Sequence, residues 1–286
     1  MKRILLIVSA VLLLIAALGV TAYPMISNLV NEKYQSTILA DYTNEIEQMD
    51  DSEIKEAKQA AQSYNEQLQP IRYDPDAIEA AAVSYDELLD LHGTGLIGYI
   101  EIPTIQVKLP IYHGTGEKVL QHGVGHLIGS SLPIGGKGSH AVLTGHSGVA
   151  GMRLFSDLDQ LQRGDVFYLH VLNETLAYQA IEINTVLPYE TELLQAVPDE
   201  DLCTLVTCTP YGINTHRLLV RGCRIPCDKT VEPTAEAPTQ HTAAKSTWKQ
   251  NYVKGLTIGA AIAIGVAALS LLTFWLSRKW RSRNEG

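Results

Sequence analysis

The sequence lacks an excess of basic residues. Its 31 Asp and Glu residues outnumber its 22 Lys and Arg residues, which gives the 286-residue chain a formal net charge of −9. Acidic proteins are repelled by the phosphates of nucleic acids and by anionic lipid surfaces. We therefore expect no nucleic-acid partner. We also find no internal repeat.

Charged residues are missing from two long segments, Ile4 to Ala22 and Gly255 to Leu276. At the rise of an α-helix these segments span roughly 29 and 33 Å, close to the bilayer core of about 30 Å. Basic residues flank each segment on its outer side and favour the cytoplasm. The pattern predicts membrane helices over 1–23 and 255–277, a basic cytoplasmic tail over 278–286 and an extracellular middle.

The extracellular middle carries nearly all of the acidity. The first flank contributes +2 and the tail +3, so −9 − 2 − 3 leaves −14 for the rest of the chain. A domain with this charge is not expected to bind the lipid surface closely.

The N-terminal segment has a second interpretation, because a basic head, an apolar stretch and Val20-Thr21-Ala22 also make up a cleavable signal peptide. The apolar stretch is longer than the apolar region of a usual signal peptide, which has about 7–15 residues, and this favours an uncleaved anchor. Under either interpretation the central part of the chain is exported.

Residues 24–92 are predicted to form a helical region. Apolar residues recur at mostly helical spacing from Gln35 to Gln69, with an interruption near Asp50-Asp51-Ser52. A short polar stretch over 72–76 follows, and then the pattern of a second helix from Ala77 to Leu91.

Residues 93–226 have the pattern of a β domain, since short apolar runs alternate with Gly, Pro and Asn. Seven or eight strands at this spacing predict a closed barrel or a sandwich. A short helix is predicted over Leu154 to Gln162, and a flexible tether rich in Thr, Ala, Pro and Glu over 227–254. The predicted strands are 96–102, 105–109, 141–144, 166–171, 176–187, 202–206 and 218–225.

Three chemically capable side chains stand at the ends of predicted strands, where a rigid scaffold typically carries its functional residues. They are Cys208, His146 and Arg217. A cysteine attacks as its thiolate, which a nearby cation favours. An imidazole carries protons near neutrality, and a guanidinium can hold an oxyanion. Taken singly, each is as easily a buried thiol, a surface histidine or an exposed strand charge.

The stretch TLVTCTPYGINTHRLLVRG, residues 204–222, resembles the active-site signature of sortases, and its form resembles the class C, pilus-assembling branch. Residues 96–115, 123–148 and 154–178 are similar to the same family, so the resemblance covers roughly residues 60 to 225. It implies a mainly β fold: the sortase-type eight-stranded β-barrel, with N-terminal helices and flanking transmembrane helices.

The resemblance assigns roles to the three residues. Cys208 matches the nucleophile, His146 the acid or base, and Arg217 the residue that binds substrate and stabilises the oxyanion. Thr207 is implied to help position substrate, although an ordinary strand residue is nearly as good an interpretation. His216 points to the opposite face by alternation and is taken as structural.

Four further histidines are assigned to loops and give no independent signal. They are His113, His122, His126 and His140. No cofactor and no metal is expected.

The resemblance implies a cysteine transpeptidase on the outer face of a Gram-positive-type cell membrane. It would cleave the Thr–Gly bond of an LPXTG-like sorting signal through a thioester and pass the acyl group to a pilin lysine, assembling covalent pili. Two alternatives stay open: a housekeeping sortase that anchors surface proteins to cell-wall peptide, and an inactive membrane-tethered scaffold.

The remaining cysteines leave a disulfide or a metal site to consider. If Cys208 lies opposite Arg217 on antiparallel strands, Cys203 faces Gly222 and Cys223 points the other way. A bridge between Cys203 and Cys223 would then need a bulge or a register slip. A Cys223–Cys227 bridge would close a very short loop, and a metal site has little support.

A lid that covers the site precedes the barrel in class C sortases, with Asp-Pro followed by an aromatic residue. The matching stretch here is Asp74-Pro75-Asp76, so a carboxylate replaces the aromatic, and Tyr73 just upstream is the substitute. Asp74 is implied to pair with Arg217, whereas a plain turn is the alternative, since Asp-Pro favours turns.

We predict a looser lid than is usual in the family. Deleting residues 70–80 is therefore expected to change the alkylation rate of the Cys208 thiol by less than about threefold, because an open lid shields the sulfur little. A large acceleration on deletion would show that the lid closes tightly.

Overall fold

The computed structural model describes residues 2–68, 85–91, 93–149, 151–227, 250, 252–261 and 265. Contacts divide the chain into two compact units, residues 1–244 and 245–286. The described part of the second unit is helical over residues 252–261. The lid stretch, most of the tether and most of the second predicted membrane helix lie outside the described residues.

Two helices precede the barrel: α1 (Lys2–Gln48) and α2 (Asp51–Leu68). The break between them is capped by Asp50, whose Oδ1 accepts hydrogen bonds from the backbone N–H of Ser52 (2.8 Å) and of Glu53 (2.9 Å). Asp is a preferred N-cap residue because its carboxylate satisfies N–H groups that lack a helical partner. The predicted interruption near residues 50–52 is confirmed.

Helix α1 joins the N-terminal apolar segment to the helical region without a break, and it contains Pro24. Within the part of the chain that the structure describes, no helix has the length and apolar content needed to cross a membrane.

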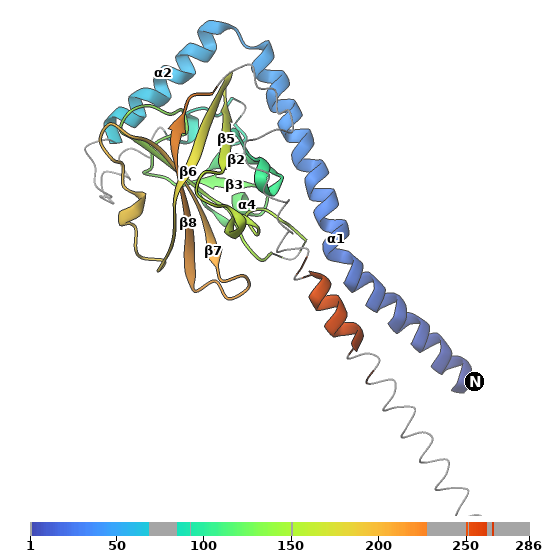
Figure 1. Cartoon of the computed structure of the whole chain (residues 1–286). Coiled ribbons are helices and arrows are strands. Elements are labelled where there is room, and N and C mark those ends of the chain that lie inside the picture. The colour runs from blue at the N-terminus through green and yellow to red at the C-terminus, as the bar shows by residue number, and fades with distance from the viewer. Residues whose placement is uncertain are drawn as a thin grey trace, which may run out of the picture. The chain divides into compact units, whose positions relative to one another are not determined.

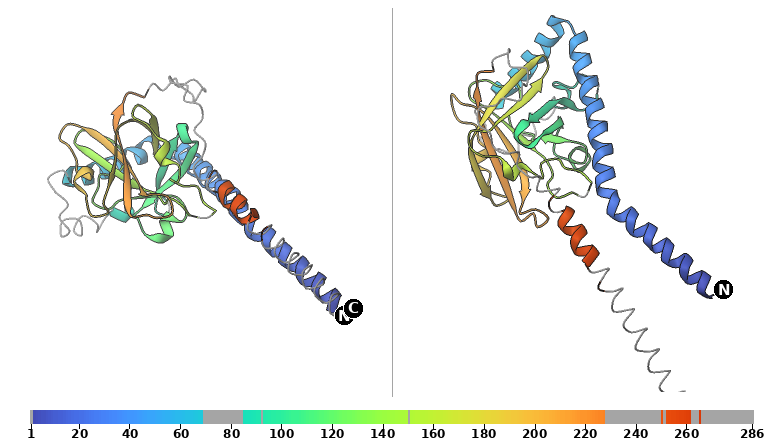
Figure 2. Two further views of the ribbon diagram at one scale, coloured as in Figure 1. Left: turned by 60° about the horizontal axis from the view of Figure 1, so that its bottom comes forward. Right: turned by 45° about the vertical axis from the view of Figure 1, so that its right-hand side comes forward.

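Both helices pack on the barrel. In the views of Figures 1 and 2, α1 runs along one side of the barrel and α2 turns back across one end. The buried Tyr42 hydroxyl donates to the carbonyl of Ile97 (3.0 Å) and accepts from the N–H of Leu172 (2.8 Å). The buried Asn65 amide makes two hydrogen bonds to the backbone of Leu132. These hydrogen bonds help to fix both helices on the barrel.

The eight strands of the described region close into a barrel in the order β1-β2-β3-β4-β7-β8-β6-β5, with β5 pairing back to β1. Their bounds are β1 (Leu96–Ile102), β2 (Val107–His113), β3 (Val124–His126), β4 (Ser139–Thr144), β5 (Val166–Val171), β6 (Glu174–Val186), β7 (Asp201–Thr209) and β8 (His216–Ile225). The predicted β-barrel is confirmed.

Two strand pairs, β2/β3 and β4/β7, are parallel, and the other pairs are antiparallel. Because β4 and β7 run in the same direction, their carboxyl ends reach the same rim of the barrel. The antiparallel partner β8 begins at that rim. The topology therefore gathers the ends of two strands and the start of a third at one place.

Large apolar side chains fill the barrel interior. Phe167 and Leu169 on β5, Leu143 on β4 and Val220 on β8 are fully buried in one cluster. Gly222 is required on β8, since a Cβ atom there would lie 2.7 Å from the Phe167 ring. Burial of this apolar surface supplies the main driving force for folding.

One strand is absent from the sequence predictions, and one predicted helix is wrong. The strand β3 was not predicted, because its three residues include a glycine and a histidine. The helix over Leu154 to Gln162 is replaced by turns and a 3-10 turn, η3 (Leu158–Gln160). Leu154 has a φ of 41°, which lies outside the right-handed helical region.

The helix predicted from Ala77 to Leu91 lies largely outside the described residues, and its described part contains the 3-10 turn η1 (Tyr85–Glu87).

Three histidines assigned to loops lie on strands: His113 on β2, His126 on β3 and His140 on β4. All three are buried, and in His126 and His140 both ring nitrogens lie within hydrogen-bond distance of a partner. His126 Nδ1 lies 2.7 Å from the Tyr85 hydroxyl, and His126 Nε2 lies 2.8 Å from the carbonyl of Ser131. Only His122, of these four, lies in a turn.

Burial lowers the pKa of His126 and of His140 to about 4, because both rings are removed from the water that would solvate the imidazolium. In the unfolded chain a histidine pKa is about 6.5. The unfolded state therefore binds more protons than the folded state between these two values.

We expect the free energy of unfolding to fall as pH drops from about 6.5 to about 4, by on the order of 1 kcal/mol per pH unit for each of the two histidines. Urea unfolding of the chain at several pH values measures this slope. A His126→Gln variant should show a shallower slope whatever its stability at neutral pH, and an unchanged slope would contradict the assignment.

Candidate active site

Cys208 and Arg217 are register partners at the connected ends of β7 and β8. The same ladder pairs Cys203 with Gly222, as predicted from the sequence, so the predicted register is confirmed. Opposite residues in an antiparallel pair have Cβ atoms about 5 Å apart and project to the same face. The side chains of Cys208 and Arg217 thus project from neighbouring strands on one face of the barrel wall.

His146 reaches the same place from the parallel strand β4. The β4/β7 ladder ends with Thr144 opposite Val206, and His146 and Cys208 each follow by two residues. Two hydrogen bonds extend the pairing beyond the ladder: Gly145 N–H donates to the carbonyl of Val206 (3.0 Å), and the Thr207 hydroxyl donates to the carbonyl of Gly145 (2.7 Å). The structure therefore brings His146, Cys208 and Arg217 together at one rim.

The buried side chain of Thr207 joins the two strands that carry His146 and Cys208. Its hydroxyl is occupied by Gly145, so the side chain contributes to the spacing of these strands. His216 pairs with Thr209, and its ring contacts the hydroxyl of Thr215 (2.9 Å).

The site opens on the outer face of the barrel. Alternation along β7 places Cys203 and Leu205 in the interior cluster, whereas Val206 belongs to a separate cluster with Val142 and Leu219. Cys208 is two residues from Val206 and shares its face. The face that carries Cys208 therefore has an apolar floor.

The connection between β6 and β7 covers part of this floor. Leu193 and Leu194, in the 3-10 turn η4 (Glu192–Leu194), pack against the outer cluster. His140 Nδ1 lies 2.8 Å from the carbonyl of Gln195, and His140 Nε2 lies 2.7 Å from the Thr204 hydroxyl. These bonds hold the connection beside the site.

Arg221 makes a second attachment for the same connection. Its guanidinium donates to the carboxylate of Glu182 at 3.0 Å and to the carbonyl of Leu193. Neither Arg221 nor His140 was predicted to serve the site. One signal in the sequence could have indicated His140: it is two residues from Val142 on the same strand, so both side chains project to the face that carries the site.

His146 faces a carboxylate, whereas Arg217 contacts backbone carbonyls. The His146 Nε2 atom lies 3.5 Å from the Glu117 carboxylate, at the start of the short helix α4 (Glu117–Leu120). Glu117 is 70% exposed, so solvent screens this contact. The Arg217 guanidinium donates to the carbonyls of Asn214 (3.2 Å) and His216 (3.0 Å), which ties it to the turn between β7 and β8.

The lid residues Tyr73, Asp74 and Asp76 lie outside the described residues. The other cysteines are free thiols. Burial raises the pKa of the Cys203 thiol well above its ordinary value, and partial burial also raises the pKa of Cys223. Both are therefore poor nucleophiles. No group of three or more potential metal-ligating side chains occurs among the described residues.

Comparison with known proteins gives one family. A model of the sortase domain matches residues 100–225. Sortase A of Streptococcus agalactiae is 29% identical over 164 residues, which cover 56% of this chain and 63% of that protein. The chain thus spans less than two thirds of the length of this curated relative.

Solved structures are more similar. Sortase C1 from Streptococcus agalactiae is 47% identical with a TM-score of 0.63, and the match covers 67% of this chain and 100% of that one. Streptococcus pneumoniae sortase C is 45% identical, with a TM-score of 0.61 and coverage of 67% and 97%. Clostridium perfringens sortase C is 43% identical, with a TM-score of 0.59 and coverage of 67% and 100%. The chain therefore belongs to the sortase family, whose members are cysteine transpeptidases, and these structural neighbours are class C sortases.

Proposed function

We propose that this chain is a membrane-anchored class C sortase that joins pilin subunits through an LPXTG-like sorting signal. The observation that carries the proposal is the convergence at one rim of Cys208 and Arg217, which are register partners, with His146, which enters from the parallel neighbour strand. The structure of S. pneumoniae sortase C bears on pilin substrate specificity, and the C. perfringens sortase C structure includes the C-terminal cell wall sorting motif.

In the first half-reaction the Cys208 thiolate attacks the threonine carbonyl carbon of the sorting signal. The Arg217 guanidinium holds the oxygen on which negative charge develops. The C–N bond to glycine then breaks, and the protonated His146 gives its proton to the leaving amine. The products are a thioester on Cys208 and a free glycine amine.

In the second half-reaction a pilin lysine amine gives a proton to His146 and attacks the thioester carbonyl. The C–S bond breaks, the thiolate is restored, and an isopeptide bond joins the subunits. The apolar floor beside Cys208 supports this choice of acceptor, because it limits the water that would otherwise hydrolyse the thioester.

The apolar segment from Ile4 to Ala22 and its basic flank support an anchor that places the barrel outside a Gram-positive-type cell membrane. In this arrangement both the sorting signal and the acceptor reach the site from the outer side of the membrane.

Replacing Arg217 with Lys should lower kcat/KM for an LPXTG-like peptide about 10- to 100-fold, because lysine keeps the charge but loses the planar fork that can bind a carbonyl oxygen. Cys208→Ala should form no covalent adduct by mass spectrometry. The matched control is His216→Ala, which removes the neighbouring side chain on the opposite face and should stay within about twofold. Equal losses in the Arg217 and His216 variants would contradict the assigned role.

Incubation with purified pilin and a cell-wall peptide amine should give a ladder of covalent pilin multimers, because the proposed acceptor is a lysine on the next subunit. Gel electrophoresis under denaturing conditions followed by mass mapping identifies the linkage. Single addition to the cell-wall amine would instead indicate the anchoring function. Full surface assembly in cells by Cys208→Ala would indicate a scaffold.

A further inference from the structure

The loop that carries His146 folds back on itself. His146 lies at its start, and the backbone carbonyl of His146 accepts a hydrogen bond from the N–H of Phe155 (3.0 Å), on the returning limb. The buried Phe155 ring packs on Gly145 so closely that a Cβ atom there would lie 2.7 Å from the ring. The position of His146 therefore depends on the placement of the returning limb.

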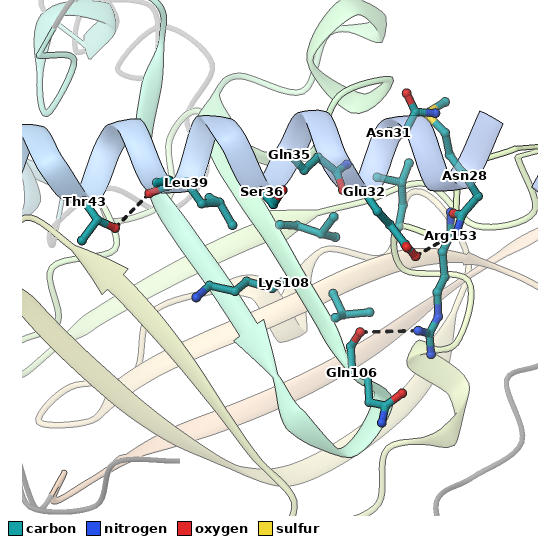
Figure 3. Close-up of a pocket in the computed structure, with 15 residues that line it drawn as sticks. Asn28, Asn31, Glu32, Gln35, Ser36, Leu39, Thr43, Gln106, Lys108 and Arg153 are labelled. Carbon is teal, nitrogen blue, oxygen red and sulfur yellow. Dashed lines mark hydrogen bonds between the residues drawn. The ribbon is translucent and has the colours of Figure 1, made fainter. Parts of the chain in front are cut away.

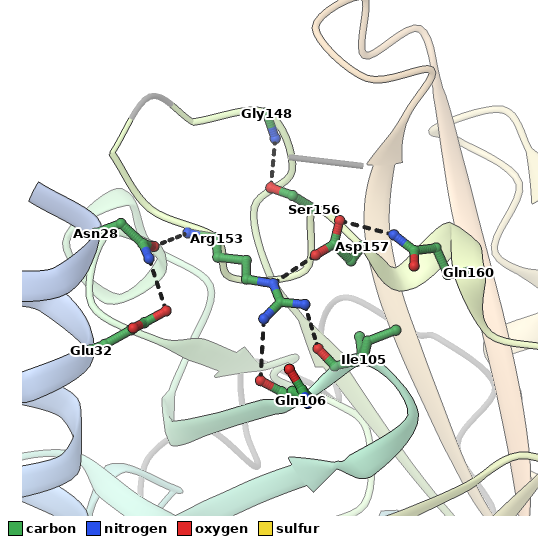
Figure 4. A network of polar contacts seen from close by, with 9 residues as sticks. All are labelled: Asn28, Glu32, Ile105, Gln106, Gly148, Arg153, Ser156, Asp157 and Gln160. Atoms are coloured by element: carbon green, nitrogen blue, oxygen red, sulfur yellow. Dashed lines mark hydrogen bonds and ion pairs between the residues drawn. The ribbon is translucent and has the colours of Figure 1, made fainter. Parts of the chain in front are cut away.

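Arg153 fixes the beginning of that limb, as Figure 4 shows. Its Nε donates to Asp157 Oδ2 (2.6 Å), and its two Nη atoms donate to the carbonyls of Ile105 (2.5 Å) and Gln106 (3.4 Å). The Asp157 side chain is fully buried, and that of Arg153 is 16% exposed. Charge-assisted hydrogen bonds shielded from water are strong and directional.

Helix α1 provides the attachment on the other side. Asn28 Oδ1 accepts a hydrogen bond from the backbone N–H of Arg153 (3.0 Å), and its Nδ2 donates to Glu32 (2.8 Å), which orients the amide. One turn further, Asn31 Nδ2 donates to the carbonyl of Gly151 (3.2 Å). Asn28 and Arg153 are 125 positions apart in the sequence, and Asn31 and Gly151 are 120 positions apart.

Close packing accompanies these hydrogen bonds at one point, since a Cβ atom at Gly151 would lie 2.7 Å from the Ser27 side chain of α1. A cavity of about 390 Å³ lies between α1 and the barrel, as Figure 3 shows, and it is bordered by Asn28 and Arg153 at one end and by Leu39 and Lys108 elsewhere. The hydrogen bonds of Asn28 and Asn31 add directional contacts beside this cavity, where the loop meets the helix.

We propose that Asn28 is a positioning residue for His146, acting through Arg153 and the returning limb of the loop. This inference rests on the proposed role of His146. Loss of the side-chain Oδ1 of Asn28 would release the backbone N–H of Arg153. The His146 imidazole would then occupy a wider range of positions. The Cys208 thiol would be unaffected, because the β7/β8 ladder holds it separately.

The test uses the full chain in detergent micelles with an LPXTG-like peptide and an amine acceptor. Asn28→Leu keeps the approximate side-chain size and removes the acceptor. It should lower kcat about 5- to 10-fold, the effect of one lost buried hydrogen bond, with KM within about twofold. Alkylation of Cys208, followed by mass mapping of its peptide, should stay within about twofold of the unmodified rate.

Two variants serve as controls. The double variant Asn28→Asp with Glu32→Gln keeps the acceptor oxygen at position 28 and turns the facing carboxylate into an amide that can donate to it, so kcat should stay within about threefold. Ser36 lies on the same helix and lines the same cavity, and its hydroxyl donates to the helix carbonyl of Lys33, so kcat should not change in Ser36→Ala.

The outcomes separate the inference from the proposed function. If His146→Ala is inactive while Asn28→Leu has the kcat of the unmodified chain, the inference is wrong and the proposed function stands. If His146→Ala retains turnover, the proposed role of His146 fails and the inference fails with it. If the double variant Asn28→Asp with Glu32→Gln loses as much activity as Asn28→Leu, general destabilisation explains the result and the positioning role is rejected. The same conclusion follows if the alkylation rate of Cys208 in Asn28→Leu changes by as large a factor as kcat.

Discussion

The parallel pairing of β4 with β7 is the constraint on which the site depends. A parallel pair sends both carboxyl ends to the same rim, so His146 and Cys208, which are 62 positions apart in the sequence, leave neighbouring strands at the same height. The antiparallel turn into β8 then needs only its register to bring Arg217 opposite the sulfur. If β4 and β7 ran in opposite directions, the imidazole would lie at the far end of the barrel from the thiol.

The buried imidazole of His140 stabilises the structure beside this rim. His140 uses both ring nitrogens, one toward the Thr204 hydroxyl on β7 and one toward Gln195 in the β6–β7 connection. A neutral ring can donate with one nitrogen and accept with the other, which suits a bridge between a strand and a loop. The lowered pKa keeps the ring neutral at physiological pH. The connection beside the apolar floor is thus held by hydrogen bonds as well as by Leu193 and Leu194.

The sequence predicted the regular parts of the fold because regular structure leaves a periodic signal. Residues 166–171 alternate cleanly and form β5 as predicted, and a single assumed pair, Cys208 with Arg217, gave the full β7/β8 register. Strand β3 left no such signal, since its three residues include Gly125 and His126. The three chemically capable residues could be predicted because strand ends and motif coincide. Glu117, which approaches His146 from a separate helix, could not, because no local pattern encodes its contact.

The attachment of α1 to the His146 loop was equally invisible in the sequence, and the orientation of the helix gives the physical reason. Near the loop, α1 buries its amides against the barrel and exposes its apolar side chains: Asn28 is 8% exposed, whereas Ile26 and Leu29 are 58% and 62% exposed. Apolar periodicity would have predicted the reverse orientation. Apolar contacts tolerate small sliding movements, whereas hydrogen bonds require particular distances and angles. A helix held by Asn28 and Asn31 is therefore set in one position against the loop, which is the property that placing an imidazole requires.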